Sequence, residues 1–182
     1  MIAAMLCAGA TTLAALASTR AAPPDSPTPR GGAEAMAGAG PRTAEDTRDV
    51  QHVMDAFHDA VVNHDGARLV ALFVPEGTTW LKVLSDEAYA RAQTSAPGTR
   101  KVIAGSPKDF AKFVSSSKLR LEPRHSNVRI LTDRTIASVY FDFVFLIDGK
   151  EENRGSETWQ LVKGEAGWRI AAITYSSDPQ VP

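Results

Sequence analysis

The chain has very little cysteine, a single Cys7, and no excess of charge of one sign, with 20 Lys and Arg against 21 Asp and Glu in 182 residues. One cysteine cannot form an internal disulfide, and it excludes a zinc site built from several thiolates. A net charge of −1 gives no basic field over the whole chain, so general nucleic-acid binding is not expected. With 43% hydrophobic and 23% charged residues, the composition is that of a globular protein of about one domain.

The first residues carry no charge before Arg20. The apolar run Ile2–Ala17 is shorter than the about 20 residues that span a bilayer as a helix. Small residues follow, and Ala15–Ala17 and Thr19–Ala21 fit the small-x-small pattern at which secretory signal peptides are cleaved. The sequence therefore predicts a signal peptide over residues 1–22, with a secreted or periplasmic location. The signal is atypical because no Lys or Arg precedes the apolar run, and a retained membrane anchor or a misplaced start stays open as an alternative.

Residues 23–42 lack aromatic residues, Val, Ile and Leu, whereas they hold five of the eleven prolines and four glycines. Such a segment buries too little apolar area to offset its ordering entropy, so we expect a flexible linker rich in Pro, Gly and Ala. The folded domain is predicted over residues 43–182, which contain every aromatic residue of the chain. After removal of the signal peptide, we expect no contact with a membrane.

The spacing of apolar residues changes along the domain. Helical spacing runs from Asp46 to Asn63, a short helix follows Asp65, and Ser106–Pro107 begins a third helix. Residues 78–84 alternate as a strand, and the twenty residues after them are expected to form a loop with one helical turn around Tyr89. Four further strands are predicted, over 119–131 (interrupted near Pro123), 136–147, 155–163 and 168–176. Helices followed by a run of strands favour an α+β fold with helices on one face of an antiparallel sheet.

Two stretches of the domain carry a resemblance to a known family. The first is FHDAVVNHD at 57–65 with LVALF at 69–73. The second is GSETWQLV at 155–162, followed by GWRI at 167–170 and by Tyr175–Ser176. Together they resemble the nuclear transport factor 2-like superfamily, which is also called SnoaL-like. The resemblance spans about residues 46–177, nearly the whole domain.

The resemblance implies a cone-shaped nuclear transport factor 2-like fold, in which three N-terminal helices pack on a curved antiparallel sheet and leave a pocket at the open end. It implies a homodimer through the outer face of the sheet, where Tyr140, Asp142 and Val144 are expected. The superfamily contains isomerases, dehydratases, epoxide hydrolases and polyketide cyclases beside binding modules. The resemblance therefore selects a fold and no single activity.

The residues that ketosteroid isomerases use are missing at the corresponding positions. On the resemblance, the tyrosine position falls on Phe57, the general base near Leu81, and the acid on Thr158 or Trp159. These side chains supply neither the carboxylates nor the phenol of that chemistry, so steroid isomerase activity is not expected. Epoxide hydrolases of this fold use acids and an arginine on a water, but Asp142 alternates with the inward-facing phenylalanines and is expected on the outer face.

Tyr175 and His125 are the weak catalytic candidates, because scytalone-type dehydratases use tyrosines and histidines around a water. A buried tyrosine held by a structural hydrogen bond is the alternative for Tyr175. On the first helix, His52, Asp55 and Asp59 share a face, and a solvated polar face is favoured there over a metal site. No Gly-rich phosphate loop, Ser nucleophile elbow or Cys–His pair is present in the sequence, so we expect no cofactor and no metal.

Charge is unevenly distributed, with a local +6 over residues 100–134 and a local −5 over residues 43–99. The aromatic residues in the basic stretch, Phe110 and Phe113, belong to the expected buried stripe of the third helix and not to a surface that could stack on nucleic acid. Complementary halves of one surface, or a subunit contact, are therefore favoured over an anion-attracting rim.

The function that these observations favour is binding of a small hydrophobic molecule in an apolar pocket, with no evident catalytic pattern. The expected lining residues are Phe57, Trp80, Phe141, Trp159, Ile173 and Tyr175. The same side chains must also form the core, so not all of them can line a void. Two alternatives stay open, an isomerase, dehydratase or polyketide-cyclase-like enzyme and a homodimeric protein-interaction module.

Overall fold

The computed structural model describes residues 41–180. The predicted signal peptide at 1–22 and the linker at 23–42 lie outside the described residues, except that the first helix already begins at Pro41. Four helices are described, α1 (Pro41–Val62), α2 (Gly66–Val70), α3 (Asp86–Ser95) and α4 (Pro107–Ser116). Six strands are described, β1 (Thr79–Leu84), β2 (Val102–Ala104), β3 (Leu121–Thr132), β4 (Ile136–Ile147), β5 (Lys150–Gly164) and β6 (Gly167–Pro179). None of these helices combines the length and the apolar character needed to cross a membrane.

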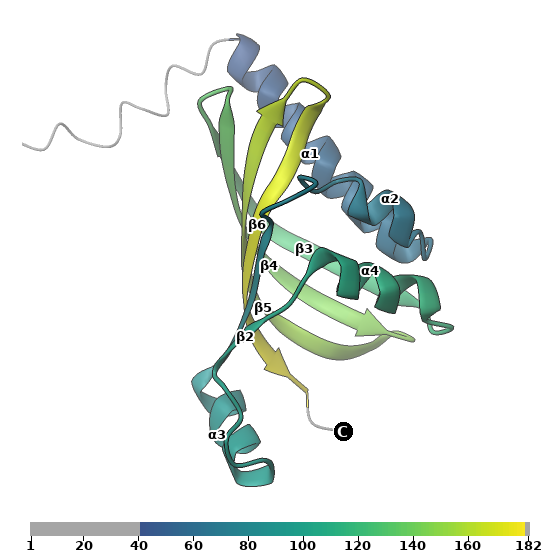
Figure 1. Ribbon diagram of the computed structural model, residues 1–182, viewed down its shortest axis with the longest axis vertical. Helices are drawn as coiled ribbons and strands as arrows, with labels where there is room; N and C mark the ends of the chain where they lie inside the picture. Colours follow the sequence, from purple (N-terminus) through teal and green to yellow (C-terminus); the bar gives the residue numbers. More distant parts are fainter. Residues whose placement is uncertain (1–40, 181–182) are drawn as a thin grey trace, which may run out of the picture. The chain divides into compact units, whose positions relative to one another are not determined.

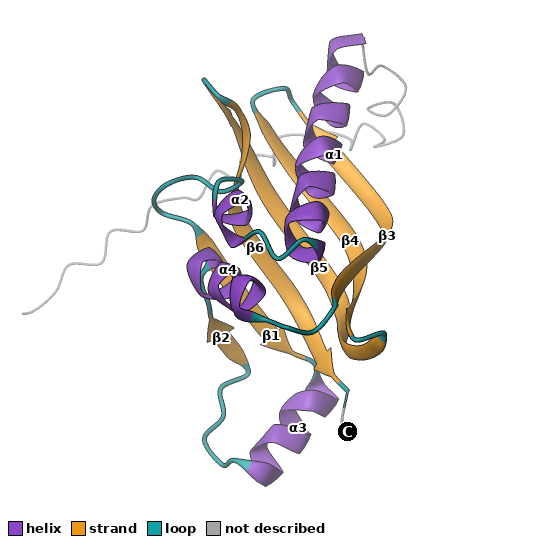
Figure 2. Cartoon of the chain, turned by 90° about the vertical axis from the view of Figure 1, so that its right-hand side faces the viewer, coloured by secondary structure: helices purple, strands orange, loops and turns teal. Residues whose placement is uncertain are grey.

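The six strands form one sheet in the order β2-β1-β6-β5-β4-β3. The last four strands pair as an antiparallel meander, β1 pairs in parallel with β6, and β2 closes the edge antiparallel to β1. Figure 1 shows the sheet curving around the side on which α1, α2 and α4 lie, whereas α3 extends beyond the end of the sheet. Figure 2 shows α1 crossing one part of this face and α2 and α4 covering another. The predicted α+β class, with helices on one face of a curved sheet, is confirmed.

Local sequence signals set the ends of these elements. Asp65 caps α2 by accepting a hydrogen bond from the backbone N–H of Arg68 at 2.8 Å, and Ser106 caps α4 in the same way at 3.1 Å from the N–H of Asp109. The β4–β5 hairpin turns at Asp148 and Gly149, whose φ angles of 51° and 79° are those of the turn that an Asp-Gly pair favours.

The core lies between α1 and the inner face of the sheet. The apolar stripe of α1 is buried, and it packs against side chains of β4, β5 and β6 that have no exposed surface, namely Phe141, Trp159 and Ile173. The outer face carries the alternate residues, and Asp142 lies there with hydrogen bonds from Asn127 Nδ2 (2.7 Å) and Ser156 Oγ (2.9 Å). The alternation along β4 therefore has the phase that the sequence predicts.

Three local expectations are wrong. The segment expected to be a loop with one helical turn around Tyr89 contains the ten-residue helix α3 and the strand β2. Ser85 caps α3 by accepting a hydrogen bond from the N–H of Ala88 at 3.0 Å. Strand β5 begins at Lys150, five residues before the predicted start, because its polar first residues pair with the end of β4. Pro123 does not interrupt β3; the irregularity lies between Ser126 and Arg129.

Candidate functional site

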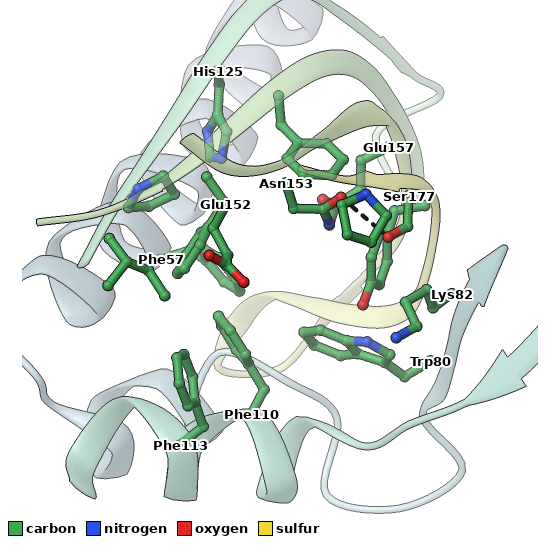
Figure 3. A pocket seen from close by; sticks show the side chains of 16 residues that line it. Phe57, Trp80, Lys82, Phe110, Phe113, His125, Glu152, Asn153, Glu157 and Ser177 are labelled. Carbon is green, nitrogen blue, oxygen red and sulfur yellow. Dashed lines mark hydrogen bonds between the residues drawn. The ribbon is translucent and has the colours of Figure 1, made fainter. Parts of the chain in front are cut away.

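A cavity of about 430 Å³ opens between the inner face of the sheet, α1 and α4. Its wall contains seven aromatic side chains, Phe57 from α1, Trp80 from β1, Phe110 and Phe113 from α4, Phe143 and Phe145 from β4, and Tyr175 from β6. Polar side chains enter it from the strands, among them Lys82, His125, Glu152, Asn153, Glu157 and Ser177. Figure 3 shows Phe110 and Phe113 rising from α4 and Asn153, Glu157 and Ser177 on the opposite, sheet side of the cavity.

The aromatic rings of the wall pack against one another. Phe57 and Phe110 stack with their centroids 5.9 Å apart, and Phe110 also lies 5.4 Å from the ring of Trp80. Tyr175 meets Trp80 and Phe143 edge to face, at 6.4 Å and 5.9 Å. Such offset and edge-to-face pairs are the favoured arrangements of aromatic rings. Side chains from α1, α4, β1, β4 and β6 therefore support one another around the space.

Glu157 brings a half-buried carboxyl group into the apolar cavity. It lies on β5 with Tyr175 as its register partner on β6, and its Oε1 accepts a hydrogen bond from Trp159 Nε1 at 2.6 Å. Burial raises the pKa of Glu157 to about 7, and the hydrogen bond from Trp159 offsets only part of this effect. Near neutral pH, the Glu157 side chain is therefore present both as a proton donor and as a proton acceptor.

Tyr175 faces the same space and keeps its phenol proton. Burial raises the pKa of Tyr175, the side chain of Trp80 acts in the opposite direction, and the charge of Glu157 raises it further. A neutral phenol can donate a hydrogen bond to a bound molecule. The hydroxyl of Tyr175 and the carboxyl of Glu157 thus form a pair of titratable groups in one apolar cavity.

His125 reaches the cavity from β3 and is mostly enclosed by aromatic rings. Its ring lies 4.6 Å from that of Phe141 and 6.4 Å from that of Trp159. The pKa of His125 is lowered to about 4. Burial is the main cause, the nearby His58 acts in the same direction, and Asp55 opposes the change. The imidazole of His125 is therefore uncharged at neutral pH. In this form it can accept a proton, but it cannot act as a cationic acid.

Three of the six predicted pocket residues, Phe57, Trp80 and Tyr175, line the cavity, and so does His125. The structure places the other three, Phe141, Trp159 and Ile173, in the core instead. They lie where α1 covers the centre of the sheet, so their side chains are completely enclosed and reach no void.

Several lining residues were missed, although the sequence carried a signal for most of them. Phe143 and Phe145 share the inward phase of Phe141, and Glu157 precedes Trp159 by two residues on the same face of β5. The acid position expected at Thr158 or Trp159 therefore lies one or two residues from Glu157, the carboxyl group that does enter the cavity. Lys82 follows Trp80 by two residues on β1, so it shares the face of Trp80, and it lines the cavity too.

The polar face of α1 has local partners. Gln51 Nε2 donates to Asp55 at 2.9 Å, and Arg68 lies 3.9 Å from Asp59.

Within residues 41–180, no group of three or more His, Cys, Asp or Glu side chains is arranged to hold a metal ion. In the basic stretch 100–134, Arg120 and Arg124 pair with Glu122 at 3.4 Å and 2.7 Å, so part of its charge is neutralised locally.

No protein-family model matches the chain, and no curated protein matches its sequence. Solved structures do match the fold. A nuclear transport factor 2-like protein of unknown function from Shewanella baltica is 15% identical, with a TM-score of 0.52 over 75% of this chain and 97% of that one. A protein of unknown function from Mycobacterium tuberculosis is 16% identical, with a TM-score of 0.57 over 79% of each chain.

A third structure, from Streptomyces avermitilis, is named as a proposed dehydratase of the same family. It is 16% identical, with a TM-score of 0.55 over 76% of this chain and 99% of that one. At these identities the likeness concerns the fold, and the activity in that name is a property of that protein. The α+β topology described above and these structural matches together show that the chain has the nuclear transport factor 2-like fold.

Proposed function

We propose that this protein binds a small hydrophobic molecule in the aromatic cavity, as an exported domain. The observation that carries the proposal is the cavity of about 430 Å³ whose wall contains seven aromatic side chains. Pockets of roughly 300–1,000 Å³ with mainly apolar walls and a few polar groups are typical of small-molecule sites. The polar groups here are few and gather on the sheet side, so they suit a ligand with one polar end.

Native mass spectrometry of the protein, purified without denaturation, tests this proposal. We expect an adduct of a few hundred daltons that denaturation releases, or binding of a naphthalene dye with a rise in its fluorescence. Phe145→Trp places a larger ring in the cavity and should abolish either signal, whereas Val144→Leu on the outer face of the same strand should leave it unchanged. A wild-type protein that neither carries an adduct nor binds the dye would contradict the proposal.

A second candidate function is general acid–base catalysis on the bound molecule. The observation that favours it is that Glu157, whose pKa lies at about 7, and Tyr175 face the same cavity. A group with a pKa near the working pH is best suited to both accept and donate a proton. His125, uncharged at neutral pH, is a further proton acceptor at the other side of the cavity.

Exchange of the α-protons of 2-tetralone in D₂O, followed by NMR, tests this candidate. Catalysis predicts exchange faster than in buffer, a dependence on pH near 7, and loss of the acceleration in Glu157→Gln. Tyr175→Phe and His125→Gln then separate the two other groups, because each removes one proton-handling side chain from the lining. Equal exchange rates in wild type and Glu157→Gln would eliminate Glu157 as the catalytic acid or base.

A further inference from the structure

We infer that the cavity takes a hydrophobic cation, an amine or quaternary ammonium compound whose charge lies between the carboxylate of Glu157 and the surrounding aromatic rings. The inference rests on the proposed function, because it names the chemical class of the molecule that the cavity binds. It is carried by two features of the wall, an acidic side chain that lacks a counter-charge and an aromatic surround.

The carboxyl group of Glu157 has one polar partner in the structure. Its Oε1 accepts from Trp159 Nε1 at 2.6 Å, and within the described residues Glu157 forms no ion pair. Glu157 is half-buried. A carboxylate that is largely withdrawn from water is normally paired with a cation or several hydrogen-bond donors, because an isolated charge away from water is costly. The chain thus leaves open a place for a positive charge, which a ligand can supply from the cavity.

The rings around Glu157 are suited to the same charge. Tyr175 is its register partner on β6, and the ring centroids of Phe143 and Trp80 lie 5.9 Å and 6.4 Å from that of Tyr175. Phe57 lies 5.0 Å from Trp159, the residue that donates to Glu157. The face of an aromatic ring attracts a cation within about 6 Å, and quaternary ammonium ligands are recognised in this way. An anionic ligand would instead be repelled by the carboxylate of Glu157 and by the negative faces of the rings.

The other charged groups of the lining do not supply the missing partner. Burial and the hydrogen bond from Trp159 determine the pKa of Glu157, with no contribution from Lys82, although Lys82 lines the cavity from β1. His125 on β3 has a pKa of about 4 and is therefore uncharged at neutral pH. Glu152 adds a second carboxyl group near the exposed side. A neutral ligand that accepts a hydrogen bond from protonated Glu157 is the main competing occupant.

A pair of probes with the same shape and different charge separates these occupants. The cation is (2-naphthylmethyl)trimethylammonium, and its neutral counterpart is 2-neopentylnaphthalene, in which carbon replaces the charged nitrogen. At pH 8, where Glu157 is mainly ionised, we expect the full-length protein to bind the cation at least about tenfold more tightly than the neutral probe. Glu157→Gln keeps an oxygen for the Trp159 hydrogen bond and should remove this preference, whereas Glu165→Gln, at an exposed residue between β5 and β6 and outside the lining, should preserve it.

The outcomes distinguish this inference from the proposed function. Equal binding of both probes, or tighter binding of the neutral one, would overturn the cationic ligand and leave the hydrophobic cavity as a binding site. Failure of both probes to bind would overturn both. If Glu157→Gln still prefers the cation, another group causes the preference, and this result would also contradict the inference.

The proton balance of binding gives an independent readout. A bound cation stabilises the ionised form of Glu157 and lowers its pKa, so at pH 7 binding should release up to about half a proton per molecule. A neutral acceptor stabilises the protonated form, so its binding should take up protons. The other titratable groups of the lining are Tyr175 from β6, Lys82 from β1, His125 from β3 and Glu152 from β5, while α1 and α4 contribute phenylalanines.

Isothermal titration calorimetry in buffers of different ionisation enthalpy measures the number of protons exchanged. We expect release in the wild type, none in Glu157→Gln, and release in the control variant Glu165→Gln, whose residue lies outside the lining. Uptake of protons with the cationic probe, or release that persists without Glu157, would overturn the inference.

Discussion

At the scale of the residue, Glu157 shows how the fold changes the acidity of an ionisable group. Its neighbours are Trp159, Tyr175 and the inner face of the sheet, and burial raises its pKa to about 7. Nothing in the sequence marks this glutamate as different from other strand residues, because its pKa depends on side chains from α1, β1 and β6. Only the alternation with Trp159 indicates that it faces inward.

Glu157 should make the stability of the protein depend on pH. Its pKa is raised from 4.5 in the unfolded chain to about 7 in the folded one, so the folded state holds the proton more tightly. The destabilisation is absent below the unfolded value, grows as pH rises between the two values, and is complete above about 7. At about 1.4 kcal/mol per pKa unit, the loss is about 3 kcal/mol.

Denaturant unfolding at pH 4.5 and pH 8 measures this loss. The free energy of unfolding of the wild type should fall by about 3 kcal/mol more than that of Glu157→Gln between these pH values. Glu152→Gln, which removes a carboxyl group from the exposed side of the cavity, should behave like the wild type. Parallel pH dependences in wild type and Glu157→Gln would show that the carboxyl of Glu157 is solvated in the folded protein.

At the scale of the element, the sequence predicts those helices and strands whose signal is local. Caps at Asp65 and Ser106 and the turn at Asp148–Gly149 are formed by neighbouring residues, so they could be recognised from the sequence. For helix α3 the sequence predicts no more than a turn around Tyr89, because the segment packs few apolar residues and shows no clear period, although Ser85 caps it. The size of the cavity depends on the distance between α4 and the sheet. Tertiary packing sets this distance, so a local sequence pattern cannot predict it.

The close approach of α2 to α4 requires a glycine. A Cβ atom at Gly66 would lie 2.5 Å from the carbonyl oxygen of Ala111 and 2.2 Å from the Oγ of Ser115. The serine side chain can rotate away, but the backbone oxygen cannot move without displacing α4. Gly66→Ala should therefore lower the free energy of unfolding by about 1–3 kcal/mol.

Denaturant titration compares Gly66→Ala with Ala67→Ser, a change at an exposed residue of the same short helix. The second variant should stay within about 0.5 kcal/mol of the wild type, as surface substitutions usually do. Because α4 carries Phe110 and Phe113 of the cavity wall, Gly66→Ala should also weaken the binding of a naphthalene dye. Unchanged stability would mean that α2 and α4 separate at little cost.

At the scale of the whole molecule, the sheet has helices on its inner face, and its outer face is rich in short polar side chains. Tyr140, 42% exposed, pairs with Thr158 in the register between β4 and β5, and Asp142 pairs with Ser156 beside it. We expect two copies of the chain to pack through this face around a two-fold axis, as the resemblance implies. In such an interface each copy presents the same patch, so residues near the axis meet their own counterparts.

Asp142→Lys should break this dimer. The carboxylate of Asp142 accepts hydrogen bonds from Asn127 and Ser156, and a lysine offers no acceptor in its place while it adds a cation to both copies of the patch. Sedimentation equilibrium should show a dissociation constant raised at least about tenfold, whereas Asp142→Asn, which keeps one acceptor oxygen, should change it less. Two controls separate loss of the interface from loss of the fold. The thermal unfolding of the variant should still be cooperative, and the variant should still bind the naphthalene dye, because the cavity lies on the other face of the sheet. A wild-type protein that is monomeric at high concentration, or a dimer that Asp142→Lys leaves intact, would assign the outer face another role.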